Sequence, residues 1–290
     1  MHLVRGATVT VESVGRAVAN YGEWLGYELV ERGVVSAELA AFWDAPKCEG
    51  AAMAVMQPES GAPCFLRFVE QPPHPDYRPL RTYGWAAIEL TVRDTDAVNA
   101  ALKGGPFEVI GPPKELDGMN TIYPMQVRGV DGEIVYLTQI REQPDGYRLL
   151  QAESDVDRIF ILVLACRDLE NTGAWLVDTL GLEKGATFAI NYTMINGAFG
   201  LPDGTQHSLA TLKHGDDVFL EIDTYPDAAT PRPTHDGWLP PGVAMASFVH
   251  PEFQHAPGAP TPDGATYRGQ PVTLLRGPDG ARFEIIGMSA

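Results

Sequence analysis

The sequence of 290 residues has few cysteines, few basic residues and no long apolar run. Its three cysteines, Cys48, Cys64 and Cys166, are an odd number without CxxC spacing, and Cys64 and Cys166 lie in apolar runs. This usage argues against a disulfide framework and favours buried free thiols in a reducing compartment. No segment approaches the roughly 18 apolar residues of a membrane span, and the start lacks the apolar segment of a signal peptide. We therefore expect a cytoplasmic protein that has no membrane partner.

Basic residues are outnumbered by acidic ones, because 21 Lys and Arg against 38 Asp and Glu give a net charge of −17. Binding to nucleic acid or to an anionic membrane needs clustered basic side chains, so the composition argues against both partners. An acidic, solvated surface is the simplest interpretation, and a surface that attracts cationic ligands is the alternative. The 44% of apolar residues are sufficient for a globular core.

The first 70 residues predict one strand, one helix and three further strands. Apolar and polar residues alternate from Ala7 to Glu12, which is typical of a half-buried strand. Apolar positions at helical spacing follow, with Ser13 as the expected N-cap and Gly26 as the end of the helix. Three short runs of strand-forming residues then complete the unit, at 28–30, 51–56 and 64–69.

The same order of elements recurs three more times, in units whose first strands begin near Trp85, Ile159 and Val243. The third unit has a helix predicted between Asp168 and Gly181, and a strand predicted from Thr187 to Ile195. In the fourth unit four prolines occupy the place of the helix, so we expect none there. The sequence therefore predicts an internal repeat of four βαβββ modules.

Five segments of these modules resemble one known superfamily. They are 21–27 (YGEWLGY), 92–98 (VRDTDAV), 131–137 (DGEIVYL), 168–182 and 278–285 (PDGARFEI). They are similar to the vicinal oxygen chelate superfamily, which includes glyoxalase I, bleomycin-resistance proteins and extradiol dioxygenases. The resemblance covers nearly the whole chain, and it implies that each pair of modules wraps its sheet into a cup.

The expected fold is therefore α+β, with four βαβββ modules paired into two cup-shaped half-barrel domains. We assign residues 1–143 to an N-terminal domain made of modules 1 and 2, and residues 155–290 to a C-terminal domain made of modules 3 and 4. The first domain is expected to be structural, and the second to hold the active or binding cup. In two-cup relatives one half commonly carries no chemistry, which is an analogy only.

The resemblance also implies where a metal would bind, because the superfamily takes its ligands from the first and last strands of each module. The corresponding first-strand positions are Gly6, Ala87, Ile161 and Ala244, and the last-strand positions are Arg67, Tyr136, Glu221 and Glu284. An extradiol dioxygenase needs two His and one Glu around iron(II), and only Glu284 of that set is present. We therefore expect no metal and no cofactor, and iron-dependent ring cleavage is disfavoured.

Strand alternation predicts an apolar C-terminal cup with two carboxylates, Glu221 and Glu284, at its floor. Burial of these groups would raise their pKa values and suit them for proton transfer near neutral pH. An ion pair of either Glu with Arg282 is an equally good interpretation. Tyr192 and Asn191, expected on a neighbouring strand, would polarise a substrate carbonyl.

In the N-terminal cup, Arg67 and Glu89 are expected to form an internal ion pair, with Tyr136, Thr8 and Thr10 completing a polar network. We therefore expect this cup to be filled and structural.

The leading hypothesis is a metal-independent lyase or isomerase that acts on a small apolar or aromatic substrate. Its expected catalytic residues are Glu284, Glu221, Tyr192 and His250, and its expected substrate-binding residues are Ile161, Val163, Ala244, Ala246, Phe248, Asn191 and Arg282. A drug-sequestering binding protein that uses the same cup is the alternative, and a protein with filled cups and a role in assembly is the third hypothesis. Exposed sheet edges are compatible with a homodimer.

Overall fold

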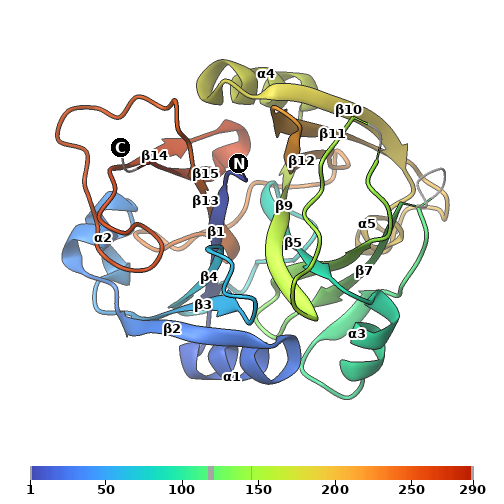
Figure 1. Cartoon of the computed structure of the whole chain (residues 1–290), viewed down its shortest axis with the longest axis horizontal. Coiled ribbons are helices and arrows are strands. Elements are labelled where there is room, and N and C mark those ends of the chain that lie inside the picture. The colour runs from blue at the N-terminus through green and yellow to red at the C-terminus, as the bar shows by residue number, and fades with distance from the viewer. Residues whose placement is uncertain (1, 117–120, 145, 289–290) are drawn as a thin grey trace.

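The computed structural model describes residues 2–116, 121–144 and 146–288, which form an α+β structure with two mixed sheets (Figure 1). In the described chain the first sheet has seven strands, in the order β14 (Val272–Arg276), β15 (Arg282–Ile286), β13 (Gly242–Val249), β1 (Val4–Val11), β4 (Phe65–Glu70), β3 (Ala52–Pro58) and β2 (Tyr27–Val34). The second sheet has eight, in the order β10 (Glu183–Ile190), β11 (His207–His214), β12 (Asp217–Thr224), β9 (Val156–Cys166), β5 (Gly84–Val92), β8 (Ile134–Ile140), β7 (Ile122–Arg128) and β6 (Glu108–Gly111).

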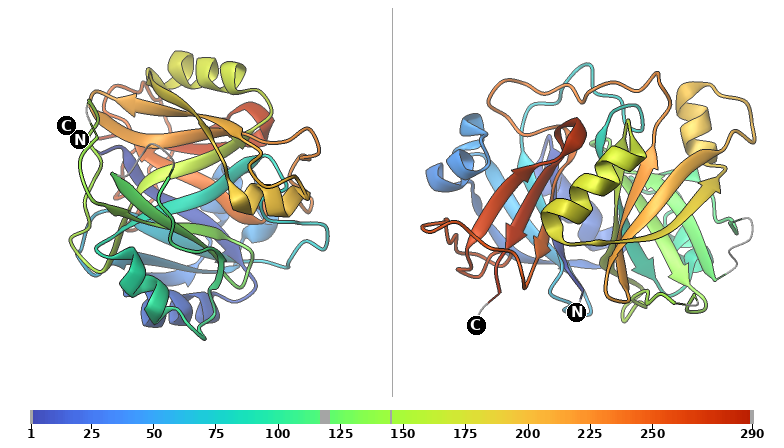
Figure 2. Two further views of the ribbon diagram at one scale, coloured as in Figure 1. Left: turned by 90° about the vertical axis from the view of Figure 1, so that its right-hand side faces the viewer. Right: turned by 90° about the horizontal axis from the view of Figure 1, so that it is seen from above.

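The helices of the described chain are short. They are α1 (Val14–Leu25), α2 (Ala37–Phe42), α3 (Thr95–Ala101), α4 (Leu169–Leu180) and α5 (Thr193–Phe199), with 3-10 turns at Pro46–Cys48 and Pro278–Gly280. None of them is long and apolar enough to cross a membrane. The two sheets lie side by side, as the right-hand view of Figure 2 shows. Helices α1 and α4 pack into the apolar core that the two sheets share.

Local capping chemistry explains why the predicted helices form where they do. Ser13 accepts a hydrogen bond from the backbone N–H of Arg16, and Gly26 ends α1 in the left-handed conformation with φ of 67°. Asp168 caps α4 in the same way, and Gly181 ends it with φ of 61°. These side chains and glycines satisfy backbone groups that a helix end leaves unpaired. In the described residues between β13 and β14 there is no helix, as the prolines predict.

The predicted division into consecutive domains is wrong, because the modules pair in a different order. β1 of module 1 is antiparallel to β13 of module 4, and β5 of module 2 is antiparallel to β9 of module 3. Neither 1–143 nor 155–290 therefore corresponds to one sheet. The repeat defines four similar modules, but every first strand offers the same open edge. The pairing thus depends on connections and on packing between sheets, which the repeat pattern does not encode. We call the sheet of modules 1 and 4 the first cup, and the sheet of modules 2 and 3 the second cup.

The segment 187–195 was also predicted incorrectly as one strand. The strand β10 ends at Ile190, and α5 begins at Thr193 with Tyr192 as its N-cap residue. The β-branched and aromatic residues there favour a strand locally, but Met194 and Ile195 are buried as parts of a short helix that ends at Gly200 with φ of 64°.

A bulge in β13 reverses the predicted faces of that strand. Thr8 pairs with Met245 and Val9 with Val243, so Ala244 is an extra residue in the ladder. Beyond it Ala246 and Phe248 join the core between the sheets instead of a cup. The Phe248 ring lies 5.7 Å from that of Phe219 on the other sheet. A one-residue slip moves every later side chain to the opposite face, which is why alternation alone failed here.

Phe248 was expected to bind substrate, and its position predicts a purely structural role. We expect Phe248→Ala to lower the free energy of unfolding by about 3–5 kcal/mol, because the truncation leaves a cavity between the two sheets. Urea unfolding followed by far-UV circular dichroism measures this change. The exposed Leu29→Ala on β2 is the control and should cost less than about 0.5 kcal/mol. A loss for Phe248→Ala as small as that of the control would contradict the assignment.

Candidate active site

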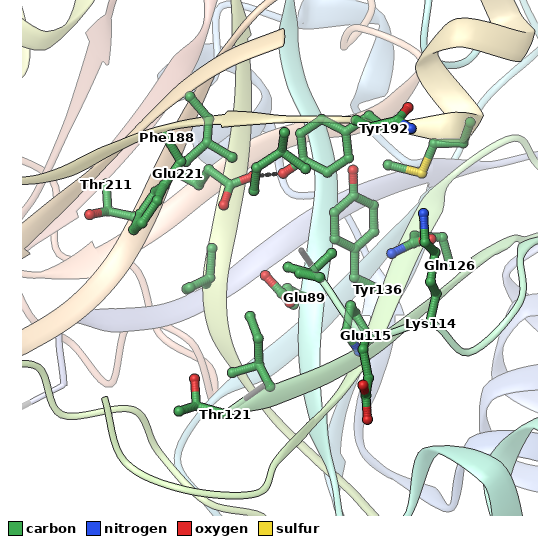
Figure 3. A pocket seen from close by; sticks show the side chains of 18 of the residues that line it. Glu89, Lys114, Glu115, Thr121, Gln126, Tyr136, Phe188, Tyr192, Thr211 and Glu221 are labelled. Atoms are coloured by element: carbon green, nitrogen blue, oxygen red, sulfur yellow. Dashed lines mark hydrogen bonds between the residues drawn. The ribbon is translucent and has the colours of Figure 1, made fainter. Parts of the chain in front are cut away.

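A cavity of about 760 Å³ lies on the concave face of the second cup (Figure 3). Its wall includes residues from β5, β8 and β9 and from the outer strands on both sides, and it is rich in aromatic and aliphatic side chains. Among them are Ile110, Ile122, Tyr136, Phe160, Ile161, Phe188, Tyr192 and Leu209. A concave, mostly apolar space with a few polar groups is typical of a small-molecule site.

Two carboxyl groups enter this cavity from strands that flank β9. Glu89 on β5 is the partner of Ile161 across the ladder, and Glu221 on β12 is the partner of Val163. These two β9 positions are two residues apart and therefore share one face of the sheet. Both glutamates line the cavity, and Figure 3 shows them with the rings of Tyr136 and Tyr192 beside them.

Burial changes the acid–base properties of both groups. Glu89 is 6% exposed, and burial, together with the neighbouring Glu221, raises its pKa to about 8, against a counteracting hydrogen bond of 2.5 Å from Thr138. Burial also raises the pKa of Glu221, although a hydrogen bond of 2.8 Å from the Tyr192 hydroxyl favours its ionised form. Desolvation disfavours the charged form of a carboxyl group, so Glu89 can hold a proton near neutral pH.

A third carboxyl group, that of Asp223, lies two residues from Glu221 on the same face of β12. Asp223 is fully buried, and burial together with the charges of Glu221 and Glu89 raises its pKa well above the usual range. Neither of its carboxylate oxygens accepts a hydrogen bond from the described side chains or backbone. A protonated Asp223 can itself donate to Glu221, which would satisfy both groups. The hydroxyl groups of Tyr136 and Tyr225 are likewise buried without a partner in the described structure.

Glu284, the expected partner of Glu221, lies in the other cup. Its oxygens are fully buried and lie 2.7 Å from Arg67 Nη2 and 2.7 Å from Trp43 Nε1. The hydroxyl groups of Tyr267 and Ser247 each donate to it at 2.5 Å. The pair of catalytic glutamates predicted for one cup is therefore wrong. The cause is the module pairing, which places module 4 against module 1.

The first cup is filled by this network, and the expected Arg67–Glu89 ion pair does not form. Arg67 also donates to Thr8 Oγ1 at 2.6 Å, and its guanidinium lies over the Trp43 ring at 4.7 Å. Arg282 is engaged with the backbone, because its Nη1 donates to the Trp43 carbonyl at 2.7 Å. Ala244 belongs to the apolar core of this cup. A filled cup was predicted, but for modules 1 and 2 rather than 1 and 4.

The remaining predicted site residues divide between the cavity and the core. Tyr192, Asn191 and Ile161 line the cavity, whereas Val163 faces the same cup but is fully buried in its apolar core. His250 is also buried, and its Nε2 donates to the carbonyl of Leu180 at 2.7 Å, at the end of α4. This position gives His250 a structural hydrogen bond in place of the expected acid–base role at a cup rim.

Glu89 and Tyr136 are the site residues that the sequence reasoning missed. Strand alternation correctly directs both into a cup, but the assumed pairing placed them in the filled one. Phe188 and Thr211 lie on outer strands of the second sheet, where they also line the cavity. Strand alternation predicts which residues share a face with Phe188 and Thr211, but it does not predict that this face lines a cavity.

Solved structures of very different sequence have the same fold. Glyoxalase I from Zea mays matches with a TM-score of 0.62 and 12% sequence identity, over 98% of this chain and 92% of that one. A candidate dioxygenase from Bacillus subtilis subsp. subtilis str. 168 matches with a TM-score of 0.61 and 13% identity, over 98% and 84%. The chain therefore has the vicinal oxygen chelate fold that its repeats predict. No family model and no curated protein matches the sequence.

The donor set of the second cup does not fit the metal that this fold implies. At the four positions that correspond to metal ligands, Ala87 and Ile161 have no donor atom, Tyr136 has a phenol, and Glu221 alone has a carboxylate. Glu89 lies two residues from Ala87, on the same face of β5. In the described part of the chain no three His, Cys, Asp or Glu side chains are arranged to hold a metal ion. The nearby third acid, Asp223, has a raised pKa and favours its protonated form, which is a poor metal ligand.

The raised pKa of Glu89 predicts a pH-dependent stability. The pKa of Glu89 is about 4.5 in the unfolded chain and about 8 in the folded protein. Its contribution to the free energy of unfolding is therefore fully favourable below pH 4.5 and is lost as the pH rises toward 8. We expect Glu89→Gln to gain about 1–4 kcal/mol relative to wild type between about pH 5 and pH 8.5. Urea unfolding at both pH values measures this gain. Glu28→Gln on the exposed β2 strand is the control, and equal pH dependence in all three proteins would refute the effect.

The buried Arg67–Glu284 pair predicts a different outcome for its own variants. Glu284→Gln should lower the free energy of unfolding by about 3–5 kcal/mol, because it leaves the Arg67 guanidinium buried beside a neutral amide. The double variant Arg67→Met with Glu284→Leu should recover part of this loss, since neither charge remains. Thermal and urea unfolding of the three proteins test the pair. A single variant as stable as wild type would show that the charge of Glu284 is dispensable.

Proposed function

We propose that the chain is an acid–base enzyme that acts, without a metal, on a small apolar or aromatic molecule in the second cup. The observation that carries this proposal is the pair of the buried Glu89 and the half-buried Glu221, two carboxyl groups with raised pKa values on one face of a cavity of about 760 Å³. Perturbed acids that share a cavity are typical of sites that move protons. The aromatic and aliphatic wall suits the body of such a substrate.

The two carboxyl groups differ in a way that suggests separate roles. Glu221 accepts a hydrogen bond from Tyr192, which supports its ionised form and orients it as the general base. Glu89, with a pKa of about 8, carries its proton at neutral pH and can act as the general acid. A substrate with a carbonyl group has, on the neighbouring carbon, a proton that is acidic enough for this pair.

In the proposed step, Glu221 takes a proton from the carbon next to the carbonyl group, and the electron pair of the broken C–H bond forms an enolate. Glu89 gives its proton to the enolate oxygen or to a second carbon of the conjugated system. Delivery to carbon produces an isomer of the substrate, with no atoms gained or lost. The two carboxyl groups then return to their starting protonation states by exchange with water, so that no oxidant or reductant is needed.

Hydrogen–deuterium exchange tests this proposal without knowledge of the product. A panel of small aryl ketones and cyclic enones is incubated with the protein in D₂O, and deuterium entering the carbon next to the carbonyl is followed by NMR. We expect enzyme-dependent exchange for at least one compound, and a loss of about 10²–10⁴-fold in Glu221→Gln. Glu28→Gln, an exposed glutamate on the other sheet, is the matched control and should retain the rate.

The outcomes separate catalysis from simple binding. Exchange that is unchanged in both Glu221→Gln and Glu89→Gln would show that these residues do not move the proton. Ligands that bind in the cavity without any exchange would instead support the function of a small-molecule binding protein.

A further inference from the structure

The two cups place equivalent residues at equivalent positions of their strands. In the first cup Arg67 is on the last strand of module 1, beside Thr8 of β1, and Glu284 is on the last strand of module 4. In the second cup Tyr136 is on the last strand of module 2, beside Glu89 of β5, and Glu221 is on the last strand of module 3. Each cup thus has an inward Glu facing a partner from the other module, which is an arginine in one cup and a tyrosine in the other.

The first cup shows how this fold satisfies its inward glutamate. The guanidinium of Arg67 lies 2.7 Å from Glu284 and is held between the faces of two aromatic rings. Its carbon Cζ is 4.7 Å from the centre of the Trp43 ring and 5.2 Å from that of Tyr267. Both rings also donate hydrogen bonds to Glu284. The chain has therefore placed its own cation in a cage of aromatic rings and a carboxylate.

The second cup has the carboxylates and the aromatic rings but lacks the arginine. Tyr192 donates to Glu221, and the rings of Tyr136 and Phe188 line the same space. Three acids, Glu89, Glu221 and Asp223, lie together there. Within the described residues the cavity wall has one basic side chain, Lys114, which is exposed and next to the acidic Glu115 in the sequence. Buried carboxyl groups without a basic partner must either stay protonated or meet a cation.

We infer that the ligand of the second cup is an organic cation, an ammonium or guanidinium group on an apolar or aromatic body. In this inference, which rests on the proposed use of the second cup as the small-molecule site, the ligand supplies the charge that Arg67 supplies in the first cup. Its cationic group lies against Glu89 and Glu221, and its body packs on the aromatic wall. The net charge of −17 favours the approach of such a ligand.

Binding of a cation is then linked to the release of protons. A positive charge beside Glu89 and Glu221 stabilises their ionised forms, whereas burial in the empty cavity favours the protonated forms. The cation therefore binds more tightly as pH rises toward 8, because fewer protons remain to be displaced. Release of one proton leaves Glu221 ionised, which is the form that the proposed proton abstraction needs, and leaves Glu89 protonated as the general acid.

Phenylguanidinium and phenylurea are a matched pair of probes, because they have nearly the same planar shape and differ in charge. Isothermal titration calorimetry at about pH 7.5 should give a dissociation constant on the order of 10-fold lower for phenylguanidinium. Its measured heat should vary with the ionisation enthalpy of the buffer, which reports released protons. Glu221→Gln and Glu89→Gln should bring the two affinities close together, and Glu28→Gln should not.

The variant Tyr136→Arg provides a second test, because it gives the second cup the counterpart of Arg67. We expect it to weaken phenylguanidinium binding at least as strongly as Glu221→Gln does, with the fold preserved in circular dichroism. Phenylurea that binds as tightly as phenylguanidinium, or no measurable binding of either probe, would overturn the inference.

A preference for the cation without deuterium exchange on any ketone would leave this inference standing and remove the proposed catalysis. Exchange on neutral ketones without any preference for the cation would support the proposed catalysis and overturn the inference of a cationic ligand.

Discussion

The antiparallel contact between first strands is the constraint on which both cups depend. β1 pairs with β13 and β5 with β9, and each contact joins two modules into one continuous sheet. The partner that a first strand receives decides which inward side chains face one another. Arg67 meets Glu284 for this reason, and Glu89 shares its cavity with Glu221. The chemistry of each cup is therefore a consequence of strand pairing, and the same four modules paired in chain order would have produced different cups.

The two cups show two ways to bury a carboxylate in one fold. In the first, an arginine, two aromatic donors and a serine form hydrogen bonds to Glu284. In the second, the carboxyl groups keep raised pKa values and face an open cavity, and the buried Asp223 beside Glu221 has no hydrogen-bond donor among the described residues. Removing one partner of a buried ion pair lowers the free energy of unfolding by more than the pair as a whole raises it. Single substitutions in the first cup are therefore expected to be strongly destabilising. In the second cup the carboxyl groups are desolvated without a basic partner, which is electrostatically unfavourable. A bound molecule of suitable charge can reduce this unfavourable free energy.

Much of the fold was predictable from the sequence because its signals are local. Ser13 and Gly26 define α1, and Asp168 and Gly181 define α4. The prolines after β13 exclude a helix in module 4. Alternation also directed Glu89, Tyr136 and Glu221 inward correctly. The site could not be assembled from these signals, because the pairing of modules is a non-local choice among equivalent edges. The bulge at Ala244 added a second error by turning Phe248 away from the cup. Each error came from a contact between residues far apart in the chain.

The first cup is built from the first and the last module of the chain, and this constrains the order of folding. Arg67 and Glu284 are 217 positions apart in the sequence. The edge of β1 stays unpaired until β13 has formed. Contacts between distant segments form late, because the intervening chain must first be brought together at a cost in loop entropy. During synthesis modules 2 and 3 emerge consecutively and can close their sheet while module 1 still lacks its partner. The second cup is therefore the part that can mature first on the ribosome, and module 4 later completes the first cup.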